Sequence, residues 1–223
     1  QAASVMAMVA VWLILLSGVL GRPIISRKTS ALLFGLLLLP WFSAPLLAMQ
    51  GTTTTIYRVG FTRLMQLAIF PAVLLFLSLC LRALWRGHRE HLLPSRWWQD
   101  PRLSGFAVSA ALTVLGFGLG AAIRGSNTVI PAHYHASIGA VTVSFMAMSY
   151  LLLEPLGMRV PGGWMRRAAG WQPMVFGLGQ MVFASGFALA GAFGMARKAY
   201  GIEQASRGLA ETIGMGVMGF GGL

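Results

Sequence analysis

The stretch that decides the fold is NTVIPAHYHASIGAVTVSFMAMSYLLLEP, residues 127–155. From Val129 to Leu153 it is almost wholly apolar, and at about 1.5 Å per residue it is long enough to cross a bilayer as a helix. His133 and His135 lie near its start. Because each residue turns a helix by ~100°, residues two apart project about 200° apart, so the two imidazoles leave opposite faces. One buried helix can therefore ligate two cofactors, one on each side.

An ionisable side chain at membrane depth is costly, and by default it marks a functional position. Two histidines within one apolar helix therefore predict a ligand site at His133 and His135. The structural alternative is a pair of interfacial histidines that only satisfy neighbouring polar groups. Motifs elsewhere in the chain distinguish between these two interpretations.

The composition predicts an all-α protein, a polytopic transmembrane bundle of about seven helices. Of the 223 residues, 57% are hydrophobic and 10% are charged, and apolar runs of helix length recur along the whole chain. We expect a single membrane domain over 1–223, as part of a longer chain, because no initiator Met opens it and it stops inside an apolar run. The expected helices cover residues 3–21, 30–49, 61–84, 104–123, 129–153, 172–195 and 212–223.

The net charge of +12 resides in the loops between these runs and predicts an orientation rather than a nucleic-acid partner. Eleven of the seventeen Lys and Arg residues lie in the first, third and fifth loops, which the positive-inside rule places in the cytoplasm. His133 and His135 then lie near the opposite, outer face. The one cysteine, Cys80, excludes disulfides within the chain and a CxxCH haem attachment, and it is expected to be a packing residue.

The segment 104–123 is rich in small residues, which let helices approach closely in lipid. Its glycines at 116, 118 and 120 are not interpreted as a phosphate-binding loop, because they lie inside a membrane helix. His88 and His91 lie in the third loop close to Trp97 and Trp98, a composition typical of a membrane–water interface.

Two motifs resemble those of one family. AHYHASIGAV, residues 132–141, is similar to the tenth-helix signature of haem-copper oxidase subunit I, the catalytic subunit of cytochrome c oxidases and of their quinol-oxidase and NO-reductase relatives. The resemblance implies that His135 holds a low-spin haem iron and His133 a high-spin one. GMARKAYG, residues 194–201, resembles the exit of helix eleven, where two cations pair with haem propionates; Arg197 and Lys198 occupy those positions. An ordinary topogenic basic pair is the alternative for these cations.

The resemblance covers residues 30–223, the C-terminal half of the family from helix six or seven to helix twelve. Arg58, Phe61 and Pro71 fall at the family spacing. Where the family has the paired copper-ligating histidines, this chain has Ala-Pro-Leu-Leu at 44–47, and Leu75 stands in place of a proton-channel lysine. The pattern therefore favours a retained scaffold, one or two haems and no copper centre.

The resemblance implies a haem-binding, electron-transferring membrane subunit that does not itself reduce oxygen. We expect it in a bacterial inner membrane with the haem side toward the periplasm, among other membrane subunits and served by a cytochrome or quinol donor. Two alternatives stay open. One is a working haem-copper oxidase or NO reductase whose missing ligands come from elsewhere, and the other is a haem-free structural or transport subunit.

Overall fold

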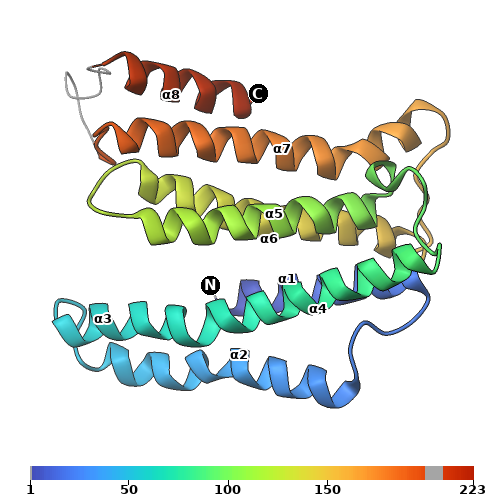
Figure 1. The fold of residues 1–223 in the computed structure, drawn as a ribbon, viewed down its shortest axis with the longest axis horizontal. Helices are drawn as coiled ribbons and strands as arrows, with labels where there is room; N and C mark the ends of the chain where they lie inside the picture. The colour runs from blue at the N-terminus through green and yellow to red at the C-terminus, as the bar shows by residue number, and fades with distance from the viewer. Residues whose placement is uncertain (1, 199–207) are drawn as a thin grey trace. The chain divides into compact units, whose positions relative to one another are not determined.

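The computed structural model describes residues 2–198 and 208–223 and is helical along its length (Figure 1). Within these residues there is no strand, only one isolated β-bridge between Asn127 and Ala196. The helices are α1 (Ala2–Leu20), α2 (Arg27–Ala48), α3 (Thr55–Leu64), α4 (Phe70–Arg89), α5 (Pro101–Ala122), α6 (Val129–Leu153), α7 (Trp164–Ala192) and α8 (Leu209–Gly221).

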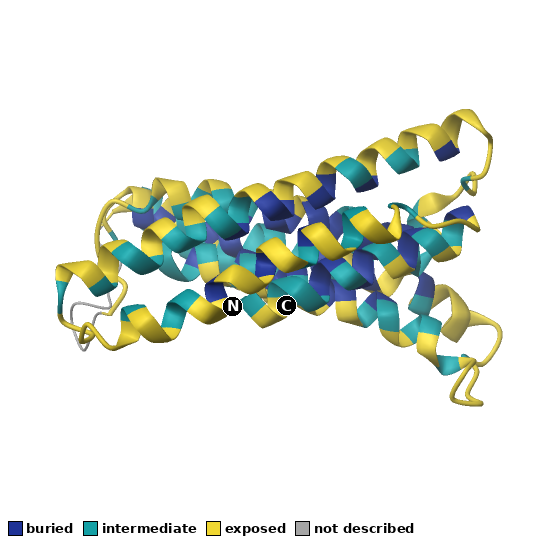
Figure 2. Ribbon diagram, turned by 90° about the horizontal axis from the view of Figure 1, so that it is seen from below, coloured by how far each residue is buried: buried dark blue, intermediate teal, exposed yellow. Residues whose placement is uncertain are grey.

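Six helical spans have the length and hydropathy needed to cross a membrane: α1, α2, the continuous helix Thr55–Arg89, α5, α6 and α7. With the shorter α8 they match the seven predicted segments. The chain is thus an all-helical integral membrane protein, as predicted. Exposed residues occur along all the helices (Figure 2), and many of them are large and apolar, which fits a lipid environment.

Two of the predicted helices have wrong boundaries. The helix expected over 172–195 begins eight residues earlier, at Trp164, and runs through the buried Pro173. The helix expected over 61–84 extends from Thr55 to Arg89 because polar turns continue it at both ends. A one-turn π-helix, Met65–Ile69, joins α3 to α4 just before Pro71. A proline removes one backbone donor, and a membrane helix accommodates the loss by a local change of helix type.

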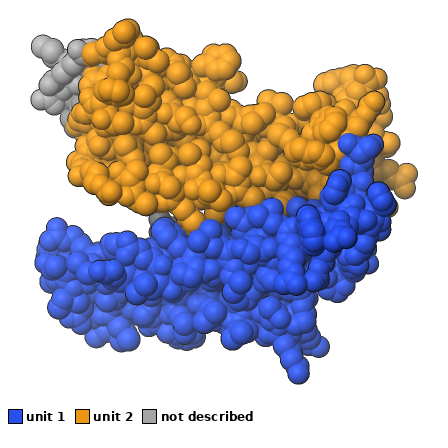
Figure 3. All heavy atoms as spheres, in the orientation of Figure 1, with its two compact units in different colours: residues 1–95 blue, residues 96–223 orange. Residues whose placement is uncertain are grey.

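The chain divides into two compact units, residues 1–95 and residues 96–223 (Figure 3). In unit 1, Phe34 of α2 packs on Phe76 of α4 with ring centroids 5.1 Å apart. The loop after α1 is joined to the end of α4 by an ion pair of 2.7 Å between Arg22 and Glu90. Cys80 is fully buried in α4, which agrees with its predicted packing role.

In unit 2, α5 and α6 run antiparallel along a seam of small residues. Gly105 faces Ala147, and the Ser109 hydroxyl donates to the Ala140 carbonyl over 2.7 Å. Further along, a methyl group added to Gly116 would lie 2.8 Å from the Ser137 hydroxyl oxygen. Small side chains allow this approach, and in lipid such close packing replaces the hydrophobic effect as the driving force for helix association.

The contact between α7 and α8 is closer still and also depends on glycine. A methyl group added to Gly186 would strike the backbone of Met218 and lie 2.5 Å from the Gly214 carbonyl oxygen. Gly214 and Gly221 of α8 face the backbone of α7 in the same way. Because backbone atoms cannot rotate aside as side chains do, any side chain in this seam must push the helices apart.

We therefore expect Gly186→Ala to separate α8 from α7 and to destabilise the protein by about 1–3 kcal/mol, the usual cost of overpacking. The matched control is Gly216→Ala on α8, where a methyl group meets nothing within 4 Å. The thermal unfolding midpoints of the two variants in detergent measure the difference. Equal midpoints would contradict the glycine seam.

Candidate functional site

The two histidines of α6 contact different neighbouring helices. The His133 ring lies against α5, whereas the His135 ring lies against α7. Both side chains are half-buried. The two imidazoles therefore leave opposite faces of α6, as their spacing predicts. His133 lies in the α5–α6 interface and His135 in the α6–α7 interface.

His133 is oriented by the backbone of α5. Its Nδ1 lies 2.7 Å from the Gly116 carbonyl oxygen, and because a carbonyl can only accept, Nδ1 carries the proton. In the neutral ring the Nε2 lone pair is then available as a ligand. Gly120 lies beside the ring, since a methyl group there would be 3.0 Å from Nδ1. Gly116 and Gly120 thus fix the imidazole at the end of the α5–α6 seam.

His135 lies in an aromatic cluster on α7. Its ring centroid is 4.6 Å from that of Phe183, edge on, and 5.8 Å from that of Phe187, nearly parallel. The two phenylalanines are one helical turn apart and contact each other at 5.2 Å. Phe183 is in turn backed by α8, where Gly222 approaches its ring and Gly221 its backbone. The α7–α8 seam therefore supports the surface on which His135 rests.

The loop after α7 is tied to the start of α6 by backbone hydrogen bonds. Thr128 N–H donates to the Met195 carbonyl over 3.0 Å, and Arg197 N–H donates to the Ser126 carbonyl over 3.1 Å. The buried Thr128 hydroxyl also donates to the Phe187 carbonyl over 2.9 Å. These bonds position the α7 exit beside the first turns of α6, where the histidines lie.

Arg197 is consequently close to the histidine pair. Its guanidinium carbon lies 5.7 Å from the ring centroid of Tyr134, the residue between the two histidines. Lys198 follows it and is exposed at the same end of unit 2. The last three residues of GMARKAYG, 199–201, lie outside the described residues, as does Arg207. The structure thus brings all four predicted site residues to one end of unit 2.

Several residues of this site are not assigned to it by the sequence patterns. They are Gly116, Gly120, Thr128, Tyr134, Phe183 and Phe187. A signal existed for the phenylalanines, because a spacing of four residues places them on one face of their helix. The glycines by themselves indicate only close helix packing. The sequence around Thr128 contains no pattern that indicates its bond to the Phe187 carbonyl.

The two remaining histidines and two further positions considered from the sequence, Arg58 and Leu75, lie in unit 1. His88 and His91 are exposed at the end of α4, in agreement with an interfacial role. Arg58 and Leu75 are exposed too. Among residues 2–198 and 208–223, no three His, Cys, Asp or Glu side chains come together as a metal-binding group.

Ala44 and Pro45, at the place where the family has its copper ligands, line an apolar pocket of about 580 Å³ in unit 1. Trp41, Phe61 and Met65 contribute to the same wall. Imidazole nitrogen, which copper and non-haem iron sites require, is not among the side chains that line it.

The histidine end of unit 2 presents side-chain types that haem groups take as partners in proteins. Haem needs a neutral imidazole with a free nitrogen, and a ligating histidine usually donates its other N–H to a carbonyl or carboxylate, as His133 does to Gly116. The flat Phe183 and Phe187 rings beside His135 suit an aromatic macrocycle. Arg197 and Lys198 supply positive charge for carboxylates at the membrane surface.

Comparison with known proteins yields no match: no protein-family model, no curated protein and no solved structure corresponds to this chain.

Proposed function

We propose that this chain is a haem-binding, electron-transferring membrane subunit of the cytochrome c oxidase subunit I type. The observation that carries the proposal is the pair of histidines on opposite faces of α6, one of them held by a backbone carbonyl in the tautomer that a metal ligand needs. Haem supplies a reversible one-electron couple when it is bound. The chain's own part is to hold, orient and electrostatically tune that group.

In this proposal His135 ligates a low-spin haem, together with a second imidazole from outside residues 1–223. His133 ligates, or once ligated, a high-spin haem. The bond from Nδ1 to the Gly116 carbonyl raises the basicity of the opposite nitrogen and holds the ring in one orientation. A haem held by two imidazoles would supply electron transfer rather than chemistry on a bound substrate.

Arg197 and Lys198 serve as partners for haem propionates. Charge-assisted hydrogen bonds are about twice as strong as neutral ones, and they count for more where water is partly excluded. The backbone bond from Arg197 to Ser126 ties this cation to the start of α6. The Arg197 guanidinium also lies over the Tyr134 ring, a cation–π contact that stabilises this position modestly.

We further propose that the chain does not itself reduce oxygen or nitric oxide. That chemistry needs a second metal next to the high-spin haem, and the residue types at 44–47 cannot supply imidazoles for it. No histidine occurs anywhere in residues 1–87. Electrons therefore pass through the chain rather than to a substrate bound by it, from a cytochrome or quinol donor to another membrane subunit.

In this proposal the haem end lies toward the periplasm of a bacterial inner membrane, and the charge distribution favours that orientation of the helices. The first, third and fifth loops carry most of the basic residues, and the histidines lie at the other end of their helices. A functional terminal oxidase and a haem-free scaffold are the competing proposals. The reduced-minus-oxidised spectrum separates the haem-free scaffold from the other two proposals. Copper content and oxygen uptake of the purified complex separate the terminal oxidase.

The first test concerns His135. We expect His135→Ala to abolish the low-spin haem spectrum, because a methyl group cannot bind iron, and His135→Phe to do the same while filling the space beside Phe183 and Phe187. His88→Ala, at an exposed position in unit 1, is the control and should keep the spectrum. The measurement is the reduced-minus-oxidised spectrum of each purified variant. A full low-spin signal in both His135 variants would refute the ligand assignment.

The second test concerns the basic pair. Arg197→Gln with Lys198→Gln should lower haem retention and also lower the reduction potential, because positive charge near the iron favours the reduced form. Exposed ion pairs contribute roughly 0.2–1 kcal/mol each, and about 59 mV corresponds to ~1.4 kcal/mol in a one-electron couple. The fall should therefore be tens of millivolts in a redox titration.

The control for the basic pair is Arg124→Gln. Arg124 is an exposed cation in the loop between α5 and α6, and its guanidinium donates to the Ala121 and Ile123 carbonyls. It changes the charge at the same end of unit 2 without touching the proposed clamp. An identical potential in the double variant and in the control would leave Arg197 and Lys198 as ordinary loop cations.

A further inference from the structure

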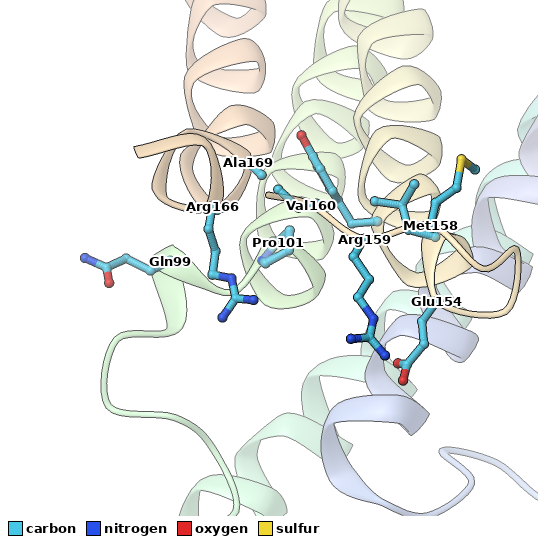
Figure 4. Close-up of a pocket in the computed structure, with 11 residues that line it drawn as sticks. Gln99, Pro101, Glu154, Met158, Arg159, Val160, Arg166 and Ala169 are labelled. Carbon is cyan, nitrogen blue, oxygen red and sulfur yellow. The ribbon is translucent and has the colours of Figure 1, made fainter. Parts of the chain in front are cut away.

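The end of unit 2 opposite the histidines contains a pocket of about 480 Å³. It lies where α5 and α7 begin and α6 ends, and its charged or polar lining comes from Gln99, Tyr150, Glu154, Arg159 and Arg166. Figure 4 shows the side chains of Arg159 and Arg166 extending in the same direction from the α6–α7 loop and from α7. The volume is within the range of small-ligand sites, roughly 300–1,000 Å³.

The positive charges of Arg159 and Arg166 are not neutralised by ion pairs with other described residues. Within the described residues, neither guanidinium lies within ion-pair distance of a carboxylate, Glu154 included. Glu154 and the two arginines together leave the lining with a net positive charge. A group of this kind favours an anion that can accept hydrogen bonds from two guanidinium forks.

The start of α7 adds to this positive field. Gly163 caps the helix without a side-chain hydrogen bond, and its first turn holds no acidic residue. Arg166 and Arg167 instead place two cations at the positive end of the helix dipole, an arrangement that lowers helix stability unless an anion is nearby.

The start of α5 shows the contrasting case. There Asp100 caps the helix, accepting from Arg102 N–H over 2.9 Å and pairing with its guanidinium at 2.7 Å. Burial acts to raise the pKa of the Asp100 carboxyl, but the hydrogen bonds and charge of Arg102 outweigh it and hold that pKa below the ordinary value. One helix therefore carries its own counter-ion, whereas α7 does not.

The surroundings indicate which anion is within reach. Trp164, at the start of α7, has 74% of its surface exposed, and Leu156, Met158 and Trp171 are exposed around the same pocket. Tryptophan and apolar side chains beside arginines are typical of the membrane–water interface, where lipid phosphates lie. Basic pockets between transmembrane helices on the cytoplasmic side are suited to anionic head groups.

We propose that the pocket formed by Gln99, Tyr150, Glu154, Arg159 and Arg166 binds the phosphate of an anionic phospholipid in the leaflet at this end of the helices. Arg159 and Arg166 hold the phosphate, and the acyl chains follow the apolar flank of α6 and α7. Glu154 opposes the negative charge and therefore limits the affinity. This inference requires that the chain spans a membrane and does not require haem.

The test uses the full chain in nanodiscs of phosphatidylcholine with increasing phosphatidylglycerol, with thermal unfolding and native mass spectrometry as readouts of bound lipid. Because a basic residue near an anionic surface contributes about fivefold to binding, Arg159→Gln with Arg166→Gln should weaken phosphatidylglycerol binding by about 25-fold. The matched control is Lys28→Gln with Arg82→Gln, two exposed cations of unit 1. It removes the same charge, and neither residue lines the pocket.

Glu154→Gln is the second variant and should strengthen phosphatidylglycerol binding, which keeps the test informative if the double variant fails to fold. Equal lipid binding by the double variant and its control would overturn the proposal, as would weaker binding by Glu154→Gln. Inorganic phosphate is added to pure phosphatidylcholine nanodiscs as a further arm. Stabilisation there equal to that by phosphatidylglycerol would assign the pocket to free phosphate and would also overturn the lipid assignment.

Discussion

Close contact between helices through small residues is the constraint on which unit 2 depends. In lipid an apolar side chain gains little by moving from a lipid neighbour to a protein neighbour, so association depends on dispersion and on backbone approach. Gly105, Ser109, Gly116 and Gly120 allow α5 to lie against α6, and the glycines at 186, 214 and 221 do the same for α7 and α8. Larger residues would separate the same helices.

This packing also positions the chemistry. The α5–α6 seam ends at His133, so Gly116 both permits the approach and offers the carbonyl that orients the ring. The α7–α8 seam holds Phe183 against His135. An imidazole held in this way is preorganised, because little conformational freedom remains to be lost when it binds a metal. The proposed haem site is thus a consequence of the packing rather than an addition to it.

Sequence patterns predicted the parts of the structure that depend on local composition. The helix over 129–153 was predicted with its observed bounds, because the apolar run ends at polar residues on both sides. The start of α7 was missed, since Trp164 to Gly170 is too basic to stand out as apolar and Pro173 suggests a boundary. The bond from Thr128 to the Phe187 carbonyl joins residues 59 positions apart, a pairing that no local pattern contains. The resemblance to subunit I rests on short local motifs, which contain no information on such long-range contacts.

The haem and copper content of the purified native complex tests directly whether the chain holds haem in the absence of a copper centre. We predict at least one haem per chain, with the sharp α band of bis-imidazole iron in the reduced-minus-oxidised spectrum, and no copper stoichiometric with the chain. A complex without haem would contradict the account. Copper at one atom per chain, bound by side chains of this chain beside a haem, would contradict it as well.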